Sequence, residues 1–234
     1  MDLLVFVAIG LALGTALGLF GGGGGILAIP LLVAAGVPTD EAGTTSLIVV
    51  GIGATGGLLP HARAGRVAWG EGATFGVLGI VGALAGSRIA LVTDDAIQLW
   101  GFAVVLVVAG TLMLRKALGS PATSDGPEPD RQRRSWLLIV TTAAAVGLFT
   151  GFFGVGGGFL VVPALTLVMG MALHRATATA LLVIVINSAA AFIPRAGEAL
   201  DVQVAAVVTL GVLVGSAVAA RWSNRWSAKG LGIG

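Results

Sequence analysis

The segment LFGGGGGILAIP spans Leu19–Pro30, and the segment FFGVGGGFLVVP spans Phe152–Pro163. The two align position by position without a gap, and each sets a run of glycines among strongly apolar residues. A glycine inside a helix costs about 1 kcal/mol relative to alanine, so a run of glycines favours a break in the helix. The sequence therefore predicts two helices that break at the glycines and resume at about Ile26 and Phe159.

The composition indicates that lipid, not water, surrounds this chain. Of its 234 residues, 56% are hydrophobic and only 10% are charged, and the mean hydropathy is +1.02, whereas soluble domains carry about 25% charged residues. Lipid offers the backbone no hydrogen-bond partners, so long apolar runs must cross it as helices. We expect an all-α polytopic membrane protein, with apolar runs at Leu3–Gly36, Thr44–Pro60, Gly70–Val92, Ala96–Leu114, Trp136–Met171, Ala176–Pro194 and Val202–Ala220.

A hydrophilic segment rich in proline and charge, residues 115–135, separates two similar halves. Internal duplication is common in secondary transporters. We therefore expect two homologous helical repeats, residues 1–114 and 136–234, and a linker that its basic residues place in the cytoplasm. Besides the glycine segments, the alignment pairs Ala42–Leu47 (AGTTSL) with Ala176–Leu181 (ATATAL), Pro60 with Pro194, and Gly86-Ser87 with Gly215-Ser216.

The second half is the shorter one. It lacks a counterpart of the fourth helix, the run that ends at Leu114; either the protein lost this helix or the sequence is truncated. The relative orientation of the halves stays open. If Leu3–Gly36 crosses the membrane once, the repeats are parallel, and if it crosses twice, they are inverted. Ile26–Gly36 makes only about 17 Å of helix, so a re-entrant or broken helix is attractive.

The glycine breaks are candidate anion sites. Non-helical backbone at membrane depth is tolerated where it is buried in protein or lines a cavity, and the free N–H groups of a resuming helix carry about half a positive charge. Two such ends can face one anion. The alternative is that the glycines only permit close helix packing. The candidate residues are Gly22, Gly23, Gly24, Gly25, Gly156, Gly157 and Gly158, and a leucine at Gly24 should abolish binding without unfolding the protein.

Hydroxyl side chains begin the apolar run that follows each break. Such hydroxyls donate hydrogen bonds to an oxyanion or cap the start of a helix, and the sequence leaves both roles open. Asn187 lies inside an apolar run, where its amide needs a partner, so we expect it to face the helix bundle. The substrate site is expected between the halves, lined by the breaks, by Asn187 and by the hydroxyls of Thr44, Thr45, Ser46, Thr177 and Thr179.

Charged side chains near the apolar runs are few. Arg63 and Arg66 lie in one basic loop and Arg195 begins its counterpart; we interpret them as topology or gating elements rather than ligands. Two crossings separate the first loop from the linker in both orientations, so it should lie on the linker side. There its charge either concentrates anions before export or only sets the topology. Glu71 and Glu198 suit a proton-coupled cycle, although carboxylates at helix ends are more often solvated.

Several classes of protein are excluded. The chain has no cysteine, which removes disulfides, thiolate metal sites and cysteine nucleophiles. The two histidines lie in separate halves, and the glycine runs lack the Lys-Ser/Thr of a nucleotide-binding loop. The basic residues do not cluster as on a nucleic-acid-binding face. We therefore expect no enzyme, no metal, no cofactor and no nucleic-acid partner.

Together the motifs resemble the sulfite exporter TauE/SafE family, also called the toluene-sulfonate uptake permease family. The resemblance covers nearly the whole chain, including its duplication, and the missing last helix is the departure from the family pattern. It implies a polytopic membrane protein that moves organosulfur anions such as sulfite, sulfoacetate or sulfonates. The matching runs are FGGGGGILAIPLL at Phe20–Leu32, AGTTSL at Ala42–Leu47, HARAGRVAW at His61–Trp69 and GFFGVGGGFLVVP at Gly151–Pro163.

The leading hypothesis is a secondary transporter, and specifically an exporter, of a small sulfur-containing anion held at the glycine breaks between the repeats. The anion chemistry follows from the residues, whereas the sulfur follows from the resemblance alone. The alternatives are a passive anion channel, for which polar intramembrane positions are too few, and a non-transporting membrane scaffold subunit. We expect an integral protein of a bacterial inner membrane whose partners are the bilayer and the anion. A coupling proton and a homodimer stay open.

Overall fold

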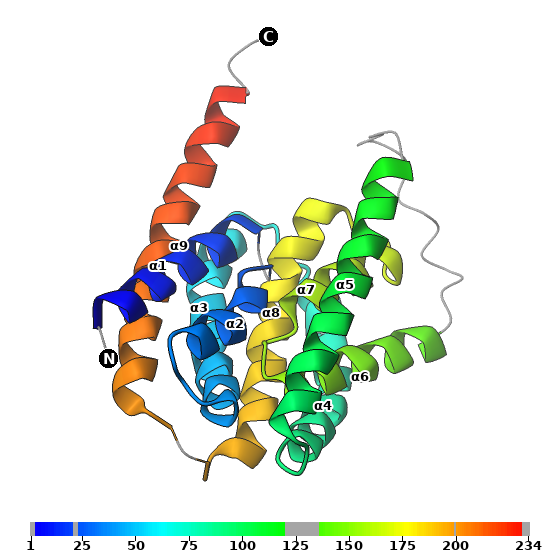
Figure 1. The fold of residues 1–234 in the computed structure, drawn as a ribbon. Helices are drawn as coiled ribbons and strands as arrows, with labels where there is room; N and C mark the ends of the chain where they lie inside the picture. Colours follow the sequence, from blue (N-terminus) through cyan, green and yellow to red (C-terminus); the bar gives the residue numbers. More distant parts are fainter. Residues whose placement is uncertain (1–2, 21–22, 120–135, 199, 231–234) are drawn as a thin grey trace.

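The computed structural model describes residues 3–20, 23–119, 136–198 and 200–230, and all the regular structure in these residues is helical. The predicted all-α class is therefore confirmed for these residues. Long helices lie side by side, and short segments interrupt them near the centre (Figure 1). The elements are α1 (Leu3–Phe20), η1 (Gly23–Leu27), α2 (Ala28–Ala34), α3 (Thr39–Arg63), α4 (Trp69–Ala90), α5 (Asp95–Gly119), α6 (Trp136–Phe153), α7 (Gly158–Leu167), α8 (Leu173–Phe192), η3 (Ile193–Arg195) and α9 (Val202–Gly230).

The described helices match a bilayer in length and polarity. Large apolar side chains such as Val81, Val92 and Leu4 are exposed on the outside, where lipid would cover them. Shorter apolar helices at Leu3–Gly18, Gly24–Ala34, Asp95–Val108 and Gly158–Leu167 accompany the longer ones. Within the described part of the chain, five segments are long and apolar enough to cross a membrane: Thr39–Arg63, Trp69–Ala90, Trp136–Phe153, Leu173–Arg195 and Val202–Ala219.

Glycine stripes join a helix of one half to a helix of the other, α1 to α9 and α6 to α4. A Cβ on Gly82 of α4 would lie 2.0 Å from the carbonyl oxygen of Ala144 in α6, and a Cβ on Gly14 of α1 would lie 2.2 Å from that of Val212 in α9. Lipid gives helices no hydrophobic reason to associate, so such close contact between small residues holds them together. The stripes are Gly10, Gly14 and Gly18 of α1, Gly211 and Gly215 of α9, Gly82 and Gly86 of α4, and Gly147 and Gly151 of α6.

The order of these contacts gives the helix directions. Along α1 and α9 the contacting residues ascend together, and the same holds for α4 and α6, so each pair is parallel. In contrast, α3 and α8 are antiparallel, because Gly43 lies against Arg195 and Gly57 lies against Leu181. Figure 1 shows α8 and α9 running in opposite senses across the bundle.

The contacts of α3 with α9 and of α4 with α8 relate the directions of all these helices to one another. Gly53 and Gly56 of α3 lie against Val212 and Leu213 of α9, so α3 is parallel to α9 and to α1. Gly72, Gly76 and Gly79 of α4 lie against Thr179, Ile186 and Asn187 in ascending order, so α8 is parallel to α4 and to α6. The helices that the sequence alignment pairs therefore run in opposite directions: α1 against α6, α3 against α8, and α4 against α9. Of the two orientations that the sequence leaves open, these helix directions agree with the inverted one.

Both glycine runs interrupt their helices, as predicted. The first α-helix ends at Phe20 and the next begins at Ala28, whereas α6 ends at Phe153 and α7 begins at Gly158. The first restart is later than the expected Ile26, because Gly23–Leu27 winds into a tighter 3₁₀ turn before the α-helix forms. Since α1 and α3 run in the same direction, η1 and α2 must carry the chain back between them.

Basic residues gather at one end of the bundle, the end from which residues 120–135 continue; we call it the linker end. The loop with Arg63 and Arg66 lies there, as predicted, although α3 extends through Pro60 to Arg63 instead of ending at the proline. Arg88 and Arg195 lie at the opposite end. The positive-inside tendency associates such a basic end with the cytoplasmic side of a membrane. Also at the linker end are Arg175, at the start of α8, and Arg115, Lys116, Arg221, Arg225 and Lys229, in the last turns of α5 and α9.

We expect Gly82→Ala in α4 to destabilise the protein and Gly110→Ala in α5 to stabilise it slightly. Both gain about 1 kcal/mol of helix propensity, but only Gly82 faces a backbone carbonyl; a Cβ on Gly110 would meet nothing within 4 Å. Overpacking costs about 1–3 kcal/mol and occasionally more. Thermal unfolding in detergent measures the difference, and equal melting temperatures would contradict the close α4–α6 contact.

Candidate functional site

The two glycine breaks meet beside the middle of α3. A Cβ on Gly25, in the first break, would lie 2.7 Å from the carbonyl oxygen of Val155 in the second break and 3.2 Å from the side chain of Val50. Gly156 also lies against Val50. The non-helical backbone of both halves is thus enclosed by protein at one place, between the halves.

The second break has a backbone that favours glycine. Gly154, Gly156 and Gly157 have φ angles of 69°, 70° and 66°, in the left-handed region. Gly157 is the N-cap of α7, and the first N–H groups of this ten-residue helix have no preceding turn to bond. Such an end attracts negative charge. We call residues 154–158 the glycine turn.

Two serine hydroxyls lie beside the glycine turn without a partner. The Ser188 hydroxyl of α8 is 3.3 Å from the place where a Cβ on Gly156 would be. Ser46 of α3 lies one turn before Val50 and shares the face with which Val50 contacts Gly156. Both serines are buried, and in the described part of the chain neither hydroxyl has a hydrogen-bond partner. A buried hydroxyl left unpaired costs about 1–3 kcal/mol, so the pair favours a polar ligand.

Asn187 and Thr45, two more of the predicted ligands, are also buried without a hydrogen-bond partner among the described residues. Asn187 lies apart from the glycine turn, and no contact with the turn is assigned to Thr45. The Asn187 side chain faces the bundle, as predicted, with its oxygen 2.8 Å from the place of a Cβ on Gly79 of α4. This puts Asn187 at the α4–α8 contact. Thr45 is 1% exposed, and its hydroxyl finds no acceptor among the described residues. Ser188 was not among the predicted ligands, and its position next to Asn187 in an apolar run was the signal for it.

The remaining predicted hydroxyls already have partners. Thr179 accepts a hydrogen bond of 3.0 Å from the backbone N–H of Ala68, where α4 begins. Thr44 donates to the carbonyl of Asp40, and Thr177 donates to the carbonyl of His174. None of these three bonds caps the start of α3 or α8, which was the alternative role that the sequence left open. Thr177 and Thr179 also lie toward the linker end of α8, more than two turns from Ser188.

The first glycine run packs more tightly than a ligand site requires. A Cβ on Gly24 would lie 2.4 Å from the backbone nitrogen of Leu17 in α1. A leucine there would collide with α1, so the expectation that Gly24→Leu leaves the fold intact is wrong. Gly25 faces the second break, Gly23 opens η1, and Gly22 lies outside the described residues.

Arg195 is the charged side chain whose position the sequence did not reveal. The interpretation of Arg195 as the start of a basic loop is wrong: it ends the short helix η3 that continues α8, and it is only 3% exposed. Its guanidinium donates to the Ser87 hydroxyl and to carbonyls in the last turn of α6. Arg63 is exposed, and it lies with Arg66 at the far, linker end.

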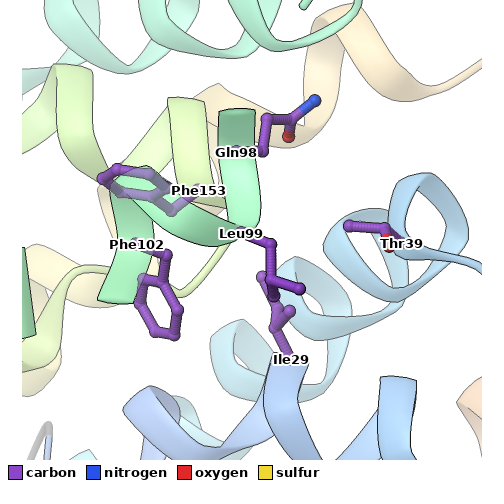
Figure 2. Close-up of a pocket in the computed structure, with 6 residues that line it drawn as sticks. All are labelled: Ile29, Thr39, Gln98, Leu99, Phe102 and Phe153. Atoms are coloured by element: carbon purple, nitrogen blue, oxygen red, sulfur yellow. The ribbon is translucent and has the colours of Figure 1, made fainter. Parts of the chain in front are cut away.

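A small cleft lies between α2, α5 and the end of α6, next to the glycine turn (Figure 2). The rings of Phe102 and Phe153 and the side chains of Ile29 and Leu99 surround it. The amide of Gln98, one of its polar groups, already donates to two backbone carbonyls. The cleft therefore offers an anion little and is not the candidate site.

The profile of the sulfite exporter TauE/SafE family matches residues 6–233. The chain belongs to this family. A probable membrane transporter protein of Xylella fastidiosa, strain Temecula1, is 36% identical over 185 residues, which are 78% of this chain and 70% of the relative. The probable membrane transporter protein YunE of Bacillus subtilis is 26% identical over 209 residues, 80% of this chain and 76% of the relative. No solved structure matches. TauE/SafE membership confirms the resemblance and makes the protein a membrane transporter by family.

We expect Ser46→Ala and Ser188→Ala to raise the melting temperature of the ligand-free protein and to weaken binding of its substrate. Each removes a buried hydroxyl that has no partner, which relieves about 1–3 kcal/mol of desolvation cost. Thr179→Val is the matched control, because its hydroxyl is bonded and its loss should destabilise the fold. Unfolding curves in detergent give the comparison. If both serine variants melt below the wild-type protein, the two hydroxyls are satisfied and the site is misplaced.

Proposed function

We propose that this TauE/SafE protein is a secondary transporter that exports a small sulfur-containing anion, such as sulfite or an organosulfonate. Two unpaired, buried hydroxyls carry the proposal: that of Ser188, which lies beside the glycine turn, and that of Ser46, on the face of α3 that meets the turn. Hydroxyl donors and free helix N–H groups can together bind three or four oxyanion oxygens without a lysine.

The charge of the site favours an anion over a cation. The N-terminus of α7 carries a partial positive charge, and the residues of the glycine turn bring no carboxylate to it. A cation would need carboxylates or several converging carbonyls in the same place. Among the described residues, no three His, Cys, Asp or Glu side chains come together in a group that could hold a metal ion.

The arrangement of the halves favours a transporter over a channel. Inverted halves can exchange conformations about a site at their boundary, which is how many secondary transporters open alternately to the two sides. The hydroxyls of Ser46 and Ser188 are buried instead of lining an open pore. A scaffold subunit would have no use for unpaired polar groups in its centre, since each destabilises it.

The proposed location is a bacterial inner membrane with the linker end in the cytoplasm. Export then starts at the linker end, where Arg63 and Arg66 lie, and finishes at the opposite end, near Arg195. A coupling proton would be carried by Glu71, in the first turn of α4 at the linker end, or by Glu198, which is exposed at the other end.

Reconstituted protein should move sulfite or a small sulfonate in a saturable, gradient-dependent way. The measurement is efflux from proteoliposomes for a panel of sulfite, sulfate, methanesulfonate, chloride and acetate, with and without a pH gradient. Liposomes prepared without protein serve as the control. Flux that never saturates would indicate a channel, and absence of flux for all five anions would overturn the transporter proposal.

Neutralising the loop with Arg63→Gln and Arg66→Gln should raise the half-saturation concentration at low salt, with the difference shrinking at high salt. The reason is that a basic pore mouth concentrates anions by a field that salt screens. Arg88→Gln, which removes one positive charge at the opposite end of the bundle, is the control. Wild-type half-saturation at every ionic strength would mean that the loop only sets orientation, which accessibility labelling can then check.

A further inference from the structure

Arg195 is a buried cation that connects three helices. Its Nε donates to the Ser87 hydroxyl of α4 at 3.1 Å, and its Nη2 donates to the carbonyls of Gly151 and Phe152 in α6 at 3.3 Å and 3.4 Å. Ser87 in turn donates to the carbonyl of Ala191 in α8 at 2.6 Å. The network fixes the guanidinium at the end of the bundle away from the linker.

The charge of Arg195 is not neutralised by contact with an acid. Within the described residues, the guanidinium forms no ion pair; Asp40 and Glu198 act on it only from a distance. Its partners are a neutral hydroxyl and carbonyls at long hydrogen-bond distances. A buried charge is costly unless it is paired, so an anion in contact with the guanidinium would lower this cost.

The guanidinium lies next to the glycine turn. A Cβ on Gly43 of α3 would come within 2.7 Å of the Arg195 Nη1, and Gly154 of the turn lies against the same Gly43. Ser46 follows Gly43 by three residues on α3, which places it on nearly the same face. Arg195 and the turn therefore both lie against Gly43, and the unpaired Ser46 hydroxyl is one turn along the same side of α3.

We propose that Arg195 supplies the fixed positive charge that binds the transported anion, at the end of the site away from the linker. Ser87 is the residue that positions the Arg195 guanidinium. This rests on the proposed function and adds to it the residue that selects for oxyanions. A planar guanidinium binds two oxygens of one sulfite or sulfonate in a bidentate manner, with an attraction between opposite charges that neutral carbonyls do not offer. The anion would thus replace the carbonyls of Gly151 and Phe152.

The two halves differ at this position. Pro194 aligns with Pro60, so the position of Arg195 is occupied by His61 in the first half. Ser216, which aligns with Ser87, donates to the carbonyl of Leu213 in its own helix. Among the described residues, a buried arginine with a serine partner therefore occurs at the end of the bundle away from the linker and not at the linker end. Ser216 therefore supplies a matched control for Ser87.

The test compares Arg195→Gln, Arg195→Lys and Ser87→Ala with the controls Arg88→Gln and Ser216→Ala. The readouts are the half-saturation concentration of efflux from proteoliposomes and the rise in melting temperature that each anion causes in detergent. We expect Arg195→Gln to raise half-saturation about tenfold to a hundredfold, as the loss of charge-assisted bonds implies. Arg195→Lys should retain binding but lose the preference for sulfite and methanesulfonate over chloride. Ser87→Ala should weaken binding less, and the controls should match the wild-type protein.

The possible results distinguish the role of Arg195 from the transporter proposal on which it rests. If Arg195→Gln melts earlier but keeps wild-type half-saturation and anion-induced stabilisation, Arg195 only braces α4, α6 and α8, and the inference is overturned while the transporter proposal stands. If Arg195→Gln does not fold, the other two variants decide. The inference about Arg195 is overturned if Arg195→Lys keeps the wild-type preference for oxyanions and Ser87→Ala keeps the wild-type half-saturation concentration. A wild-type protein that neither moves nor is stabilised by any anion overturns both.

Discussion

The structure depends on one constraint: a backbone that leaves the helical hydrogen-bond pattern inside a bilayer must be enclosed by protein. This chain leaves it twice, at the two glycine runs. The break of one half lies against the break of the other, with Gly25 beside Val155 and with Gly25 and Gly156 both beside Val50. The exchange of helices, α1 onto α9 and α6 onto α4, is the packing that brings the two breaks together.

Glycine serves two purposes in this fold, and the contacts distinguish them. Along α1, α4, α6 and α9 the glycines let backbones touch, and Gly24 belongs with them because it packs against α1. In the turn at 154–158 the glycines instead adopt left-handed angles that release N–H groups at the start of α7. The asymmetry makes the second break the better candidate for a ligand, with Ser46, Ser188 and Arg195 around it.

The sequence predicted the helical class, the breaks and the linker-side loop, because hydropathy and glycine runs report directly on backbone state in lipid. It did not predict which hydroxyls are free. Thr44, Thr45 and Ser46 are consecutive, and whether each bonds to backbone depends on helix rotation and on neighbours distant in sequence. Arg195 was misinterpreted for the same reason: the last turn of α6, which surrounds it, lies far from it along the chain. The helix directions likewise needed contacts such as Gly43 with Arg195, which no local pattern contains.

The central claim is that an oxyanion binds between the inverted halves, at the glycine turn. Anomalous diffraction from crystals soaked in selenite, a heavier analogue of sulfite, tests it most directly, and the absence of cysteine removes the side reaction of selenite with thiols. The account predicts a selenium peak enclosed by the N-terminus of α7, the hydroxyls of Ser46 and Ser188, and the guanidinium of Arg195. A peak elsewhere in the bundle, with this region unchanged, would contradict it.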